Sequence, residues 1–533
     1  MTLSSDLTRI VRVALLLLCV AWGAASLSYP FGWDQGIMAS VGDALLHGSM
    51  PHRDAWDIKG PVAHVWFATG QLLFGRGQLG IRALDLALLT WAAFALARTG
   101  RQLTRSSAGA WLAIGLVLSH ASVGYFYTAQ PDGAVSFALT VAFAPLFVPT
   151  PTRRALAMSG VVIGIAMLMK PLYGVFLLVP GLVVLQTTER PLAARVQSLL
   201  IVGIATALPV AAMLGWFAAR GALDEMFDVY IRYNASSYSG VTDFSLRQRA
   251  MGVVRYFLPW PRAIALLAML AGSATLLHRD RRRALLIFGW FLGALALVVS
   301  QGKFFVYHWA VIFPYAALLV AVGITALTEA GQPATAAPTT GPTAAPTTAR
   351  TPATRMRSAL GATMVLAIVL PLAHQPASDA MHWVRFVSGG ESRAQYYARF
   401  GLDDRRYVAA DQMAAAEFIR ANTTDRDRVA IFGYVAPVLF LSGRANATRY
   451  SYALPLVGHR SSSVFRTTYR RDYMASLADV PAYVVVGLLF SGKERTLDEF
   501  PEFKAYLAQH FALQRSFGNV DVYRRQEGVP AAP

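Results

Sequence analysis

One short polar segment of this apolar chain carries charged side chains in an arrangement that could do chemistry. Between residues 29 and 61 the charged and titratable residues include Asp34, His52, Arg53, Asp54, Asp57 and Lys59. A carboxylate can take a proton from an attacking hydroxyl group, and nearby cations can stabilise the charge on a leaving phosphate. Mixed charges in an exposed loop are often only solvated, so the elements around this segment must decide between the two interpretations.

The composition predicts that these charges lie at a membrane surface. Hydrophobic residues make up 55% of the 533 residues and charged residues only 15%, which is too apolar for a soluble multidomain enzyme. Apolar blocks such as Val11–Val20, Ala108–Leu118 and Ala284–Val299 alternate with short basic or Gly/Pro-rich joints, as membrane-spanning helices do. The single cysteine, Cys19, excludes a disulfide framework and a thiolate metal site.

The arginines predict which helix ends face the cytoplasm, because short cytoplasmic loops collect Lys and Arg whereas translocated loops do not. Arg9 and Arg12 precede the first span, and later basic clusters lie at residues 98–105, 153–154, 190–195 and 278–283. The less basic joints between them, which we expect outside with residues 29–79, are 129–132, 170–173, 219–249 and 301–308. The N-terminus is then inside, and there are about eleven spans of about twenty residues each. The net charge of +18 thus indicates topology and not a nucleic-acid partner.

Two segments allow a second interpretation. Residues 24–26 would suit a signal peptidase, but the amount of membrane sequence that follows favours an uncleaved anchor. Residues 62–74 are short for a span and contain His64 and Gln71, so we expect a helix lying at the outer interface. If this helix crossed the membrane, all later basic clusters would lie outside.

Hydropathy divides the chain into four parts. Residues 1–329 form a transmembrane module, and residues 330–356 form a cytoplasmic linker rich in Pro, Thr and Ala that cannot bury a core. Residues 357–374 form a last transmembrane helix, and residues 375–533 form a soluble domain outside the membrane. In that domain the pattern predicts helices at 409–421 and 499–511 and strands at 428–434, 482–487 and 519–524, an α/β arrangement.

The order of several short motifs resembles the GT-C superfamily, specifically the bacterial relatives of protein O-mannosyltransferases and of the lipid A aminoarabinose transferase. Members carry an acid after the first helix, then a Gly-x-x-Pro-[Tyr/His]-x-Asp turn, then an acidic-x-Lys-x-Pro step. The matching residues are Asp34; Gly48, Pro51, His52 and Asp54; Asp57, Lys59 and Pro61; then Arg82, Asp132, Lys170 and Pro171. The resemblance covers roughly residues 10–325. Gln35 stands where many relatives have a second acid, which weakens the case for a metal held by that pair.

The resemblance implies a GT-C-like bundle of about eleven transmembrane helices with a C-terminal α/β domain outside the cytoplasmic membrane. It also implies a glycosyltransferase whose donor is a polyprenyl-phosphate-linked sugar and whose acceptor is a glycan, lipid or protein. Asp34 is the candidate catalytic base. The candidate substrate-binding residues are His52, Asp54, Asp57, Lys59, Asp132, Lys170, Lys303, Tyr307 and His308. No cofactor is certain, and a divalent metal ion at Asp34 and Asp132 stays open; Arg232 is a further candidate cation for the phosphate.

Ordinary structural roles compete with each of these assignments. Lys and His at helix ends extend toward the interface and its membrane lipids, and an acid at a helix start, such as Asp132, pairs with the helix dipole. Tyrosines of the loop 219–249 could stack on sugars or anchor the interface.

Two other functions fit a polytopic basic chain: a transporter or flippase of lipid-linked sugars, and a membrane-anchored scaffold. Transporters place ionisable residues within their spans. Here Asp85 is the main such residue, and the other acids gather at one membrane face. That distribution favours chemistry at the membrane surface, while the sugar and the acceptor stay open.

Overall fold

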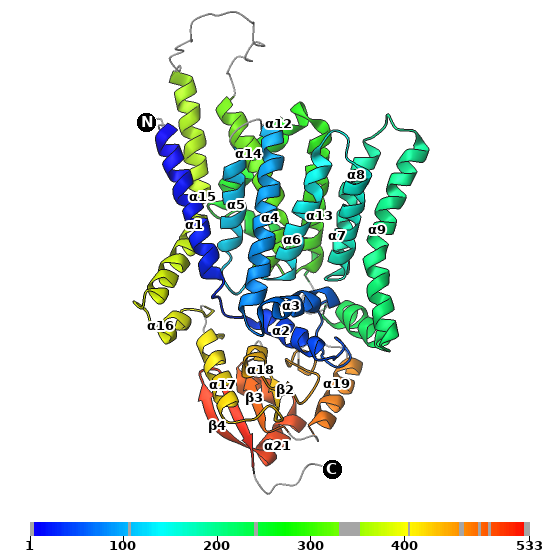
Figure 1. Cartoon of the computed structure of the whole chain (residues 1–533), viewed down its shortest axis with the longest axis vertical. Coiled ribbons are helices and arrows are strands. Elements are labelled where there is room, and N and C mark those ends of the chain that lie inside the picture. The colour runs from blue at the N-terminus through cyan, green and yellow to red at the C-terminus, as the bar shows by residue number, and fades with distance from the viewer. Residues whose placement is uncertain are drawn as a thin grey trace, which may run out of the picture.

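The computed structural model describes residues 5–104, 108–238, 244–329, 352–402, 406–457, 463–477, 481–488 and 492–526. Its helices form an upright bundle, and a small domain with a β-sheet lies at one end of that bundle (Figure 1). The predicted linker at 330–356 lies almost entirely outside the described residues, as does Arg105 of the predicted basic clusters.

Long apolar helices build the bundle. In the described part of the chain the bundle helices are α1 (Ser5–Ser26), α4 (Leu79–Thr104), α5 (Ala108–Ala121), α6 (Pro131–Phe143), α7 (Arg153–Met167), α8 (Leu178–Leu185), α9 (Leu192–Ala219), α12 (Arg262–Arg279), α13 (Arg281–Gln301), α14 (Phe313–Glu329) and α15 (Pro352–Val387). By length and composition, six of the described helices could cross a membrane, and α12 with the helix bent against it, α11 (Leu246–Phe257), would be a seventh. Helices α5, α6, α7 and α8 are shorter and lie in the same bundle (Figure 1). The chain is therefore a multi-pass membrane protein with the predicted fold class.

Small residues let some of these helices approach closely. A methyl group on Gly272 of α12 would lie 2.0 Å from the carbonyl oxygen of Leu319 in α14, and one on Gly323 of α14 would lie 1.9 Å from that of Ala268. Close backbone approach of this kind is typical of helix packing in membranes, where van der Waals contact replaces the hydrophobic effect between helices. The pair therefore fixes α12 against α14.

The predicted sidedness of the loops is internally consistent. Arg283 donates hydrogen bonds to the carbonyl oxygens of Phe147 and Gln102, so the basic joints at 98–105 and 278–283 meet at the bundle end far from the small domain. The less basic joints at 129–132, 170–173 and 301–308 lie at the other end. The structure thus places the basic joints at one end of the bundle and the less basic joints at the other. The assignment of the small-domain end to the outside stays a prediction.

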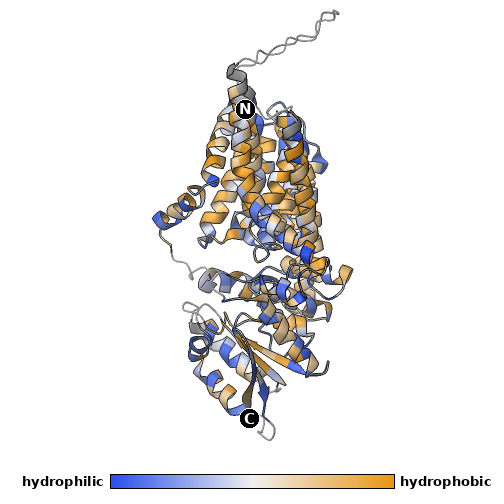
Figure 2. Cartoon of the chain, turned by 90° about the vertical axis from the view of Figure 1, so that its left-hand side faces the viewer, coloured by the Kyte–Doolittle hydropathy of each residue, from blue (hydrophilic) through white to orange (hydrophobic). Residues whose placement is uncertain are grey.

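Two helices lie across the bundle end, between the bundle and the small domain. They are α2 (Trp33–Leu46) and α3 (Pro61–Phe74), and neither runs along the bundle axis (Figure 1). Figure 2 shows hydrophobic residues dominating the bundle and a more polar mixture in the small domain. Leu72, Leu73 and Phe74 are exposed at the end of α3, which suits the interfacial helix expected at 62–74.

The last bundle helix is longer than its sequence suggests. The span expected at 357–374 continues as α15 to Val387, so the small domain begins later than residue 375. Pro371 and Pro376 lie inside this helix, where neighbouring helices of a membrane bundle tolerate prolines that would end a soluble helix.

The small domain is built on a five-stranded mixed sheet in the order β2-β1-β3-β5-β4. The strands are β1 (Arg428–Phe432), β2 (Ala445–Asn446), β3 (Tyr483–Gly487), β4 (Phe511–Phe517) and β5 (Val520–Arg525). The helices are α16 (Arg393–Ala398), α17 (Ala409–Ala421), α18 (Ala436–Ser442), α19 (Ser463–Ser476), α20 (Lys493–Asp498) and α21 (Pro501–His510). Strand β1 pairs parallel with β2 and β3, whereas β5 pairs antiparallel with β3 and β4. Alternate residues of β1 belong to different hydrophobic cores, so the sheet is covered on both faces.

The first loop joins the small domain directly. The Trp56 amide donates to the Arg449 carbonyl oxygen over 2.8 Å, and Trp56 is buried among the aromatic rings of the small domain. At Gly36 of α2, a methyl group would lie 2.5 Å from the ring of Pro437 in α18. The charged loop is therefore enclosed between the bundle and this domain.

Candidate active site

A tight turn opens the charged part of the first loop. Gly48 and His52 have φ angles of +90° and +70°, values that glycine adopts freely and histidine rarely. The Met50 amide donates to the Asp54 carboxylate over 2.8 Å, and Arg53 pairs with the same carboxylate. Asp54 thus stabilises the turn, and the structure does not bring it to the other candidate residues.

Asp57 is the buried anchor of the loop. Its two carboxylate oxygens lie 3.0 Å from His64 Nε2 and 2.9 Å from the Tyr452 hydroxyl, which donates from the small domain. Burial opposes its charge, but Lys59, His64 and Tyr452 outweigh burial and hold the pKa of Asp57 below its ordinary value. Asp57 therefore stays ionised and ties the loop to α3 and to the small domain.

His52 lies next to Asp57 in the same loop. It is fully buried, its Nδ1 atom lies 2.9 Å from the Asp57 carbonyl oxygen, and its ring stacks near Tyr230 and Phe217. Burial, followed by the nearby His64, lowers the pKa of His52 to about 3, so the ring is neutral at physiological pH. The structure places His52 in the framework of the loop.

Asp34 and Lys59 form the first acid and lysine pair of the site. Asp34 lies in the first turn of α2, and Lys59 Nζ lies 3.0 Å from its Oδ1 atom and 4.0 Å from Asp57. Burial would lower the pKa of Lys59, but the two carboxylates raise it above its ordinary value. The Asp34 side chain keeps 27% of its surface exposed. A carboxylate within reach of solvent is thus oriented by a permanently charged lysine.

Asp132 and Lys170 form the second pair. Lys170 Nζ lies 2.6 Å from Asp132, which also accepts a 2.7 Å hydrogen bond from Tyr173, and Lys170 donates to Gln301 over 2.9 Å. Asp132 begins α6, and Lys170 directly precedes the 3-10 helix η2 (Pro171–Leu177). Asp132 is fully buried. Through its hydrogen bond with Gln301 at the end of α13, the pair joins three bundle segments at the small-domain end.

Lys303 is the third lysine of the site. Its Nζ atom lies 2.8 Å from the centroid of the Tyr238 ring, at the end of the π-helix η3 (Phe227–Tyr238). Burial, followed by repulsion from Lys170, lowers the pKa of Lys303 to about 6. The environment therefore favours loss of the proton unless an anion joins the site.

Tyr307 and His308 lie next to these cations. Lys170 Nζ is 5.8 Å from the centroid of the Tyr307 ring, and the rings of Tyr307 and His308 are 4.7 Å apart. His308 is buried, and its Nδ1 atom has no hydrogen-bond partner among the described residues.

Most of the predicted site residues therefore converge. The residues that the structure brings together are Asp34, Asp57, Lys59, Asp132, Lys170, Lys303, Tyr307 and His308. Arg232 does not join them, because it is exposed and pairs with Asp228 on its own helix. A metal ion at Asp34 and Asp132 would have to displace the paired lysines, and among the described residues no three His, Cys, Asp or Glu side chains form a metal site.

Several further residues of the site carried no sequence motif. Tyr434 and Tyr452 come from the small domain, and His64 comes from α3. Gln301 could have been predicted from the sequence, because it lies two residues before Lys303 in a joint that was predicted to lie outside. Contacts between segments this far apart in the chain leave no local pattern.

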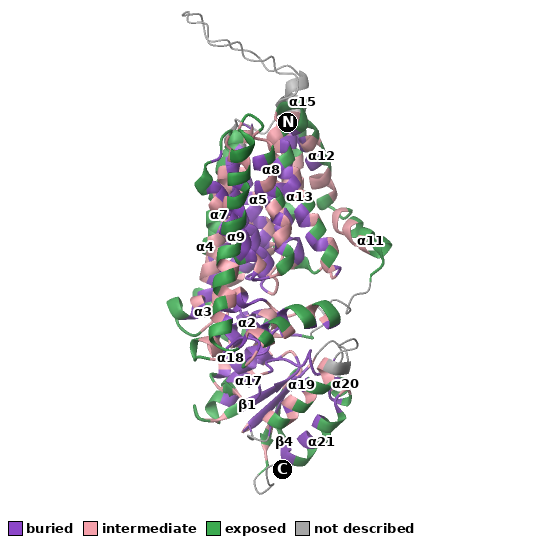
Figure 3. Cartoon of the chain, turned by 90° about the vertical axis from the view of Figure 1, so that its right-hand side faces the viewer, coloured by how far each residue is buried: buried purple, intermediate pink, exposed green. Residues whose placement is uncertain are grey.

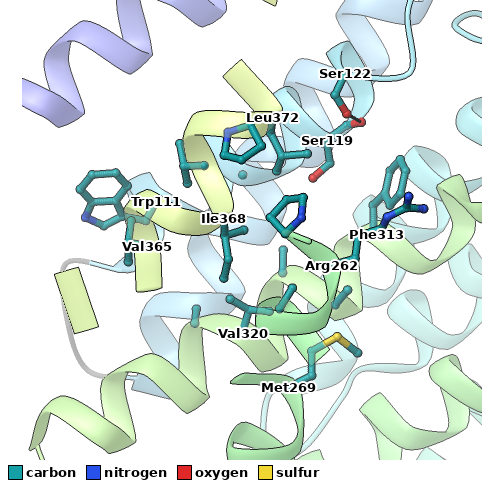
Figure 4. A pocket seen from close by; sticks show the side chains of 18 of the residues that line it. Trp111, Ser119, Ser122, Arg262, Met269, Phe313, Val320, Val365, Ile368 and Leu372 are labelled. Atoms are coloured by element: carbon teal, nitrogen blue, oxygen red, sulfur yellow. Dashed lines mark hydrogen bonds between the residues drawn. The ribbon is translucent and has the colours of Figure 1, made fainter. Parts of the chain in front are cut away.

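An apolar pocket of about 900 Å³ opens in the bundle (Figure 4). Helices α5, α12, α14 and α15 line most of it with residues such as Met269, Val320 and Ile368, and Ser119 and Arg262 add polar groups. Phe304 and Val306 also line it. The pocket therefore reaches the segment that carries Lys303 and Tyr307.

Comparisons with known proteins agree with this fold. Residues 59–216 match the family described as dolichyl-phosphate-mannose-protein mannosyltransferase. The fold is similar to ArnT from Cupriavidus metallidurans bound to undecaprenyl phosphate, with a TM-score of 0.60, 14% identity and coverage of 99% of this chain and 100% of ArnT. The apo state of ArnT gives a TM-score of 0.59 at the same identity and coverage. None of the curated proteins matches the sequence.

The chain is a polytopic membrane protein that shares the fold of ArnT, as its motifs predicted. Residues 59–216 match the mannosyltransferase family, and the fold shared with ArnT extends over nearly the whole chain.

Proposed function

We propose that the chain is a glycosyltransferase that moves a sugar from a polyprenyl-phosphate donor to an envelope glycan, lipid or protein at the outer face of the cytoplasmic membrane. One observation carries this proposal: Asp34 lies with Lys59, Lys170 and Lys303 at one end of the bundle, beside an apolar pocket. A polyprenyl-phosphate sugar has both complementary parts, an anionic phosphate at the membrane surface and a long apolar chain. The undecaprenyl phosphate bound by ArnT, which shares the fold, supports the same donor class.

The side chains suit a direct displacement at the anomeric carbon. Asp34 takes the proton of the acceptor hydroxyl as its oxygen bonds to that carbon, and the bond to the phosphate oxygen breaks. The leaving phosphate keeps the electron pair, and the lysines stabilise its charge. Lys59 holds the Asp34 carboxylate in place, so the base is oriented before the acceptor arrives.

The apolar pocket supplies a site for the lipid chain. Its walls are mostly aliphatic and aromatic (Figure 4), and its lining includes Phe304, the residue that follows Lys303. A polyprenyl chain in this pocket would leave its phosphate near the cations at the bundle end.

The rival transporter function depends on Asp85, the ionisable residue within a span. Asp85 lies 2.9 Å from His120 Nε2 and accepts a hydrogen bond from the Ala129 amide. One turn earlier on the same helix, Arg82 donates to the Pro30 carbonyl oxygen and to Thr128. These residues brace the loops that lead to Asp34 and Asp132, which favours a structural role over an ion path.

Reconstitution with lipid-linked sugars tests the proposed function. Purified protein in liposomes receives undecaprenyl-phosphate-linked mannose, arabinose or glucose together with envelope extract, and released undecaprenyl phosphate is measured. We expect release with at least one donor, and release at least about 10²-fold slower with the Asp34→Asn variant. Movement of a donor across the bilayer without release would instead support the flippase.

Lys303 should make donor binding depend on pH. Below pH 6 Lys303 is already charged, whereas above it a bound phosphate must draw in a proton, so affinity should fall as pH rises, by at most about tenfold per pH unit. The probe is undecaprenyl-phosphomannose, a phosphodiester whose own charge is constant, and its Kd is measured between pH 6 and 8.5 on the Asp34→Asn protein.

The added substitution Lys303→Met should flatten this pH dependence. Arg232→Met is the matched control, because that cation lies outside the site and should leave the slope unchanged. A Kd that is constant with pH before Lys303 is replaced would contradict a role for Lys303 in phosphate binding.

A further inference from the structure

The segment 302–309 contributes side chains both to the candidate active site and to the apolar pocket. Three of them belong to the site: Lys303, Tyr307 and His308. Three others line the pocket: Phe304, Val306 and Trp309. One short stretch of backbone therefore carries both sets, and whatever occupies the pocket lies against the segment that holds Lys303.

The backbone of this segment is unusual on both sides of Lys303. Gly302 and Phe304 have φ angles of +66° and +51°, and a non-glycine residue such as Phe304 rarely adopts such a value. A strained conformation of this kind persists only where the surrounding contacts hold it. The position of Lys303 therefore depends on what packs against its neighbours in the segment.

Helix α11 packs against the segment from one side. Figure 3 shows this helix at the side of the bundle, and none of its residues is buried. A methyl group on Gly252 of α11 would lie 2.7 Å from the ring of Phe304. Tyr256 of α11 stacks on Trp309 with 3.6 Å between ring centroids and 3° between planes. Because Phe304 and Trp309 also line the pocket, an occupant of the pocket contacts the same two rings.

The pocket follows the bundle helices over much of their length. Its lining includes Ala108 and Ser119, from opposite ends of α5, and Phe313 and Thr325 of α14. Helix α5 has 14 residues and is therefore about 21 Å long. A short ligand would leave most of this space empty, whereas a long prenyl chain could fill it.

We propose that the prenyl chain of the donor fills this pocket, packs against Phe304 and Trp309, and so holds the segment 302–309 in its active conformation. The length of the chain then determines the rate of transfer as well as the affinity for the donor. This inference rests on the proposed function and specifies its donor class as long-chain prenyl phosphates. Phe304 and Trp309 are positioning residues, because they act through Lys303 and the rest of the segment.

An anchoring chain and a positioning chain have different kinetic effects. Contacts far from the reacting atoms raise kcat only where their binding energy is used to hold the reacting groups in place. A chain that only anchors the donor would change KM and leave kcat as it is. The ratio of kcat values between long and short donors therefore separates the two roles.

The experiment compares three donors that differ only in chain length. Each carries the sugar that the wild type transfers, linked through a phosphate to a geranyl, farnesyl or undecaprenyl chain, so all three leaving groups are allylic phosphates of the same chemistry. Transfer is measured in detergent over a range of donor concentrations, which gives kcat and KM separately. We expect kcat to be about 10- to 10²-fold lower with the geranyl donor than with the undecaprenyl donor.

A substitution that fills the pocket provides a second test. Val320 of α14 lines the pocket (Figure 4), so Val320→Trp should exclude a long chain. It should lower kcat for the undecaprenyl donor toward the geranyl value and leave kcat for the geranyl donor unchanged. Leu270→Trp is the matched control, because Leu270 of α12 is exposed and does not line the pocket. Thermal unfolding in detergent verifies that both variants fold.

The donor series needs no variant, so it decides the question even where Val320→Trp does not fold. Equal kcat values for all three donors, with differences in KM alone, would overturn the positioning role and leave the proposed function standing. Equal losses with the geranyl and undecaprenyl donors in Val320→Trp would overturn it as well. If the wild type transfers sugar from no donor, the proposed function fails first.

Discussion

Asp34→Asn should lower the rate of sugar transfer by about 10²- to 10⁴-fold, the usual contribution of a positioned general base. The amide cannot accept the proton of the acceptor hydroxyl, but it has the size of the carboxylate. The fold should persist, because Asp34 is partly exposed and Lys59 keeps Asp57 as a partner. Transfer of labelled sugar and the melting temperature in detergent are measured on the same preparation.

Asp43→Asn is the matched control for this variant. Asp43 lies on the same helix and is also paired with a cation, Arg76, and its side chain is about as exposed as that of Asp34, at 21% against 27%, but this pair lies away from the site. It should retain transfer within a factor of about two, since surface ion pairs contribute little. Wild-type turnover in Asp34→Asn, or equal losses in both variants, would show that Asp34 is not the base.

Lys170→Met should destabilise the protein by about 3 kcal/mol, because it leaves the buried Asp132 carboxylate without its cation. We take the lower end of the range for buried ion pairs, since 25% of the Lys170 side chain is exposed. Tyr173 still donates a hydrogen bond, but a neutral donor does not balance a buried charge. The melting temperature is compared at one scan rate, because membrane proteins often unfold irreversibly.

A double variant separates stability from function at this pair. Lys170→Met with Asp132→Asn removes both charges and should regain most of the lost stability. If Lys170 also binds the donor phosphate, transfer stays low in the double variant although its melting temperature recovers. A Lys170→Met variant as stable as the wild type would instead contradict a stabilising ion pair between Lys170 and Asp132. Arg232→Met is the control, because it breaks an exposed ion pair and so measures the change in melting temperature that a surface pair causes.

Much of the architecture could be predicted because membranes impose strong local rules. Apolar blocks gave the bundle, and the arginines separated its two ends, as the meeting of Arg283 with Phe147 and Gln102 illustrates. The predicted helix 409–421 coincides with α17. The end of α15 was missed because its prolines and polar residues resemble a loop, whereas packing in the bundle keeps them helical.

The site was predictable only in part, for a different reason. Asp34, Lys59, Asp132 and Lys170 sit in short motifs, so their types and order were visible, but their pairing was not. His52 resembled a substrate ligand by sequence and lies fully buried instead. The contribution of the small domain had no motif at all, because a hydrogen bond between Asp57 and Tyr452 depends on the folded chain.

The hydrogen bond between Asp57 in the first loop and Tyr452 in the small domain also has a consequence for the order of events during synthesis. Asp34 and Lys59 emerge early from the ribosome, whereas Tyr434 and Tyr452 follow only after the last bundle helix has been made. Domains fold largely in the order in which they are synthesised. A chain still being inserted therefore contains Asp34 and Lys59 before Tyr452 can bind Asp57, so we expect the proposed transfer to begin only after the C-terminal domain has docked.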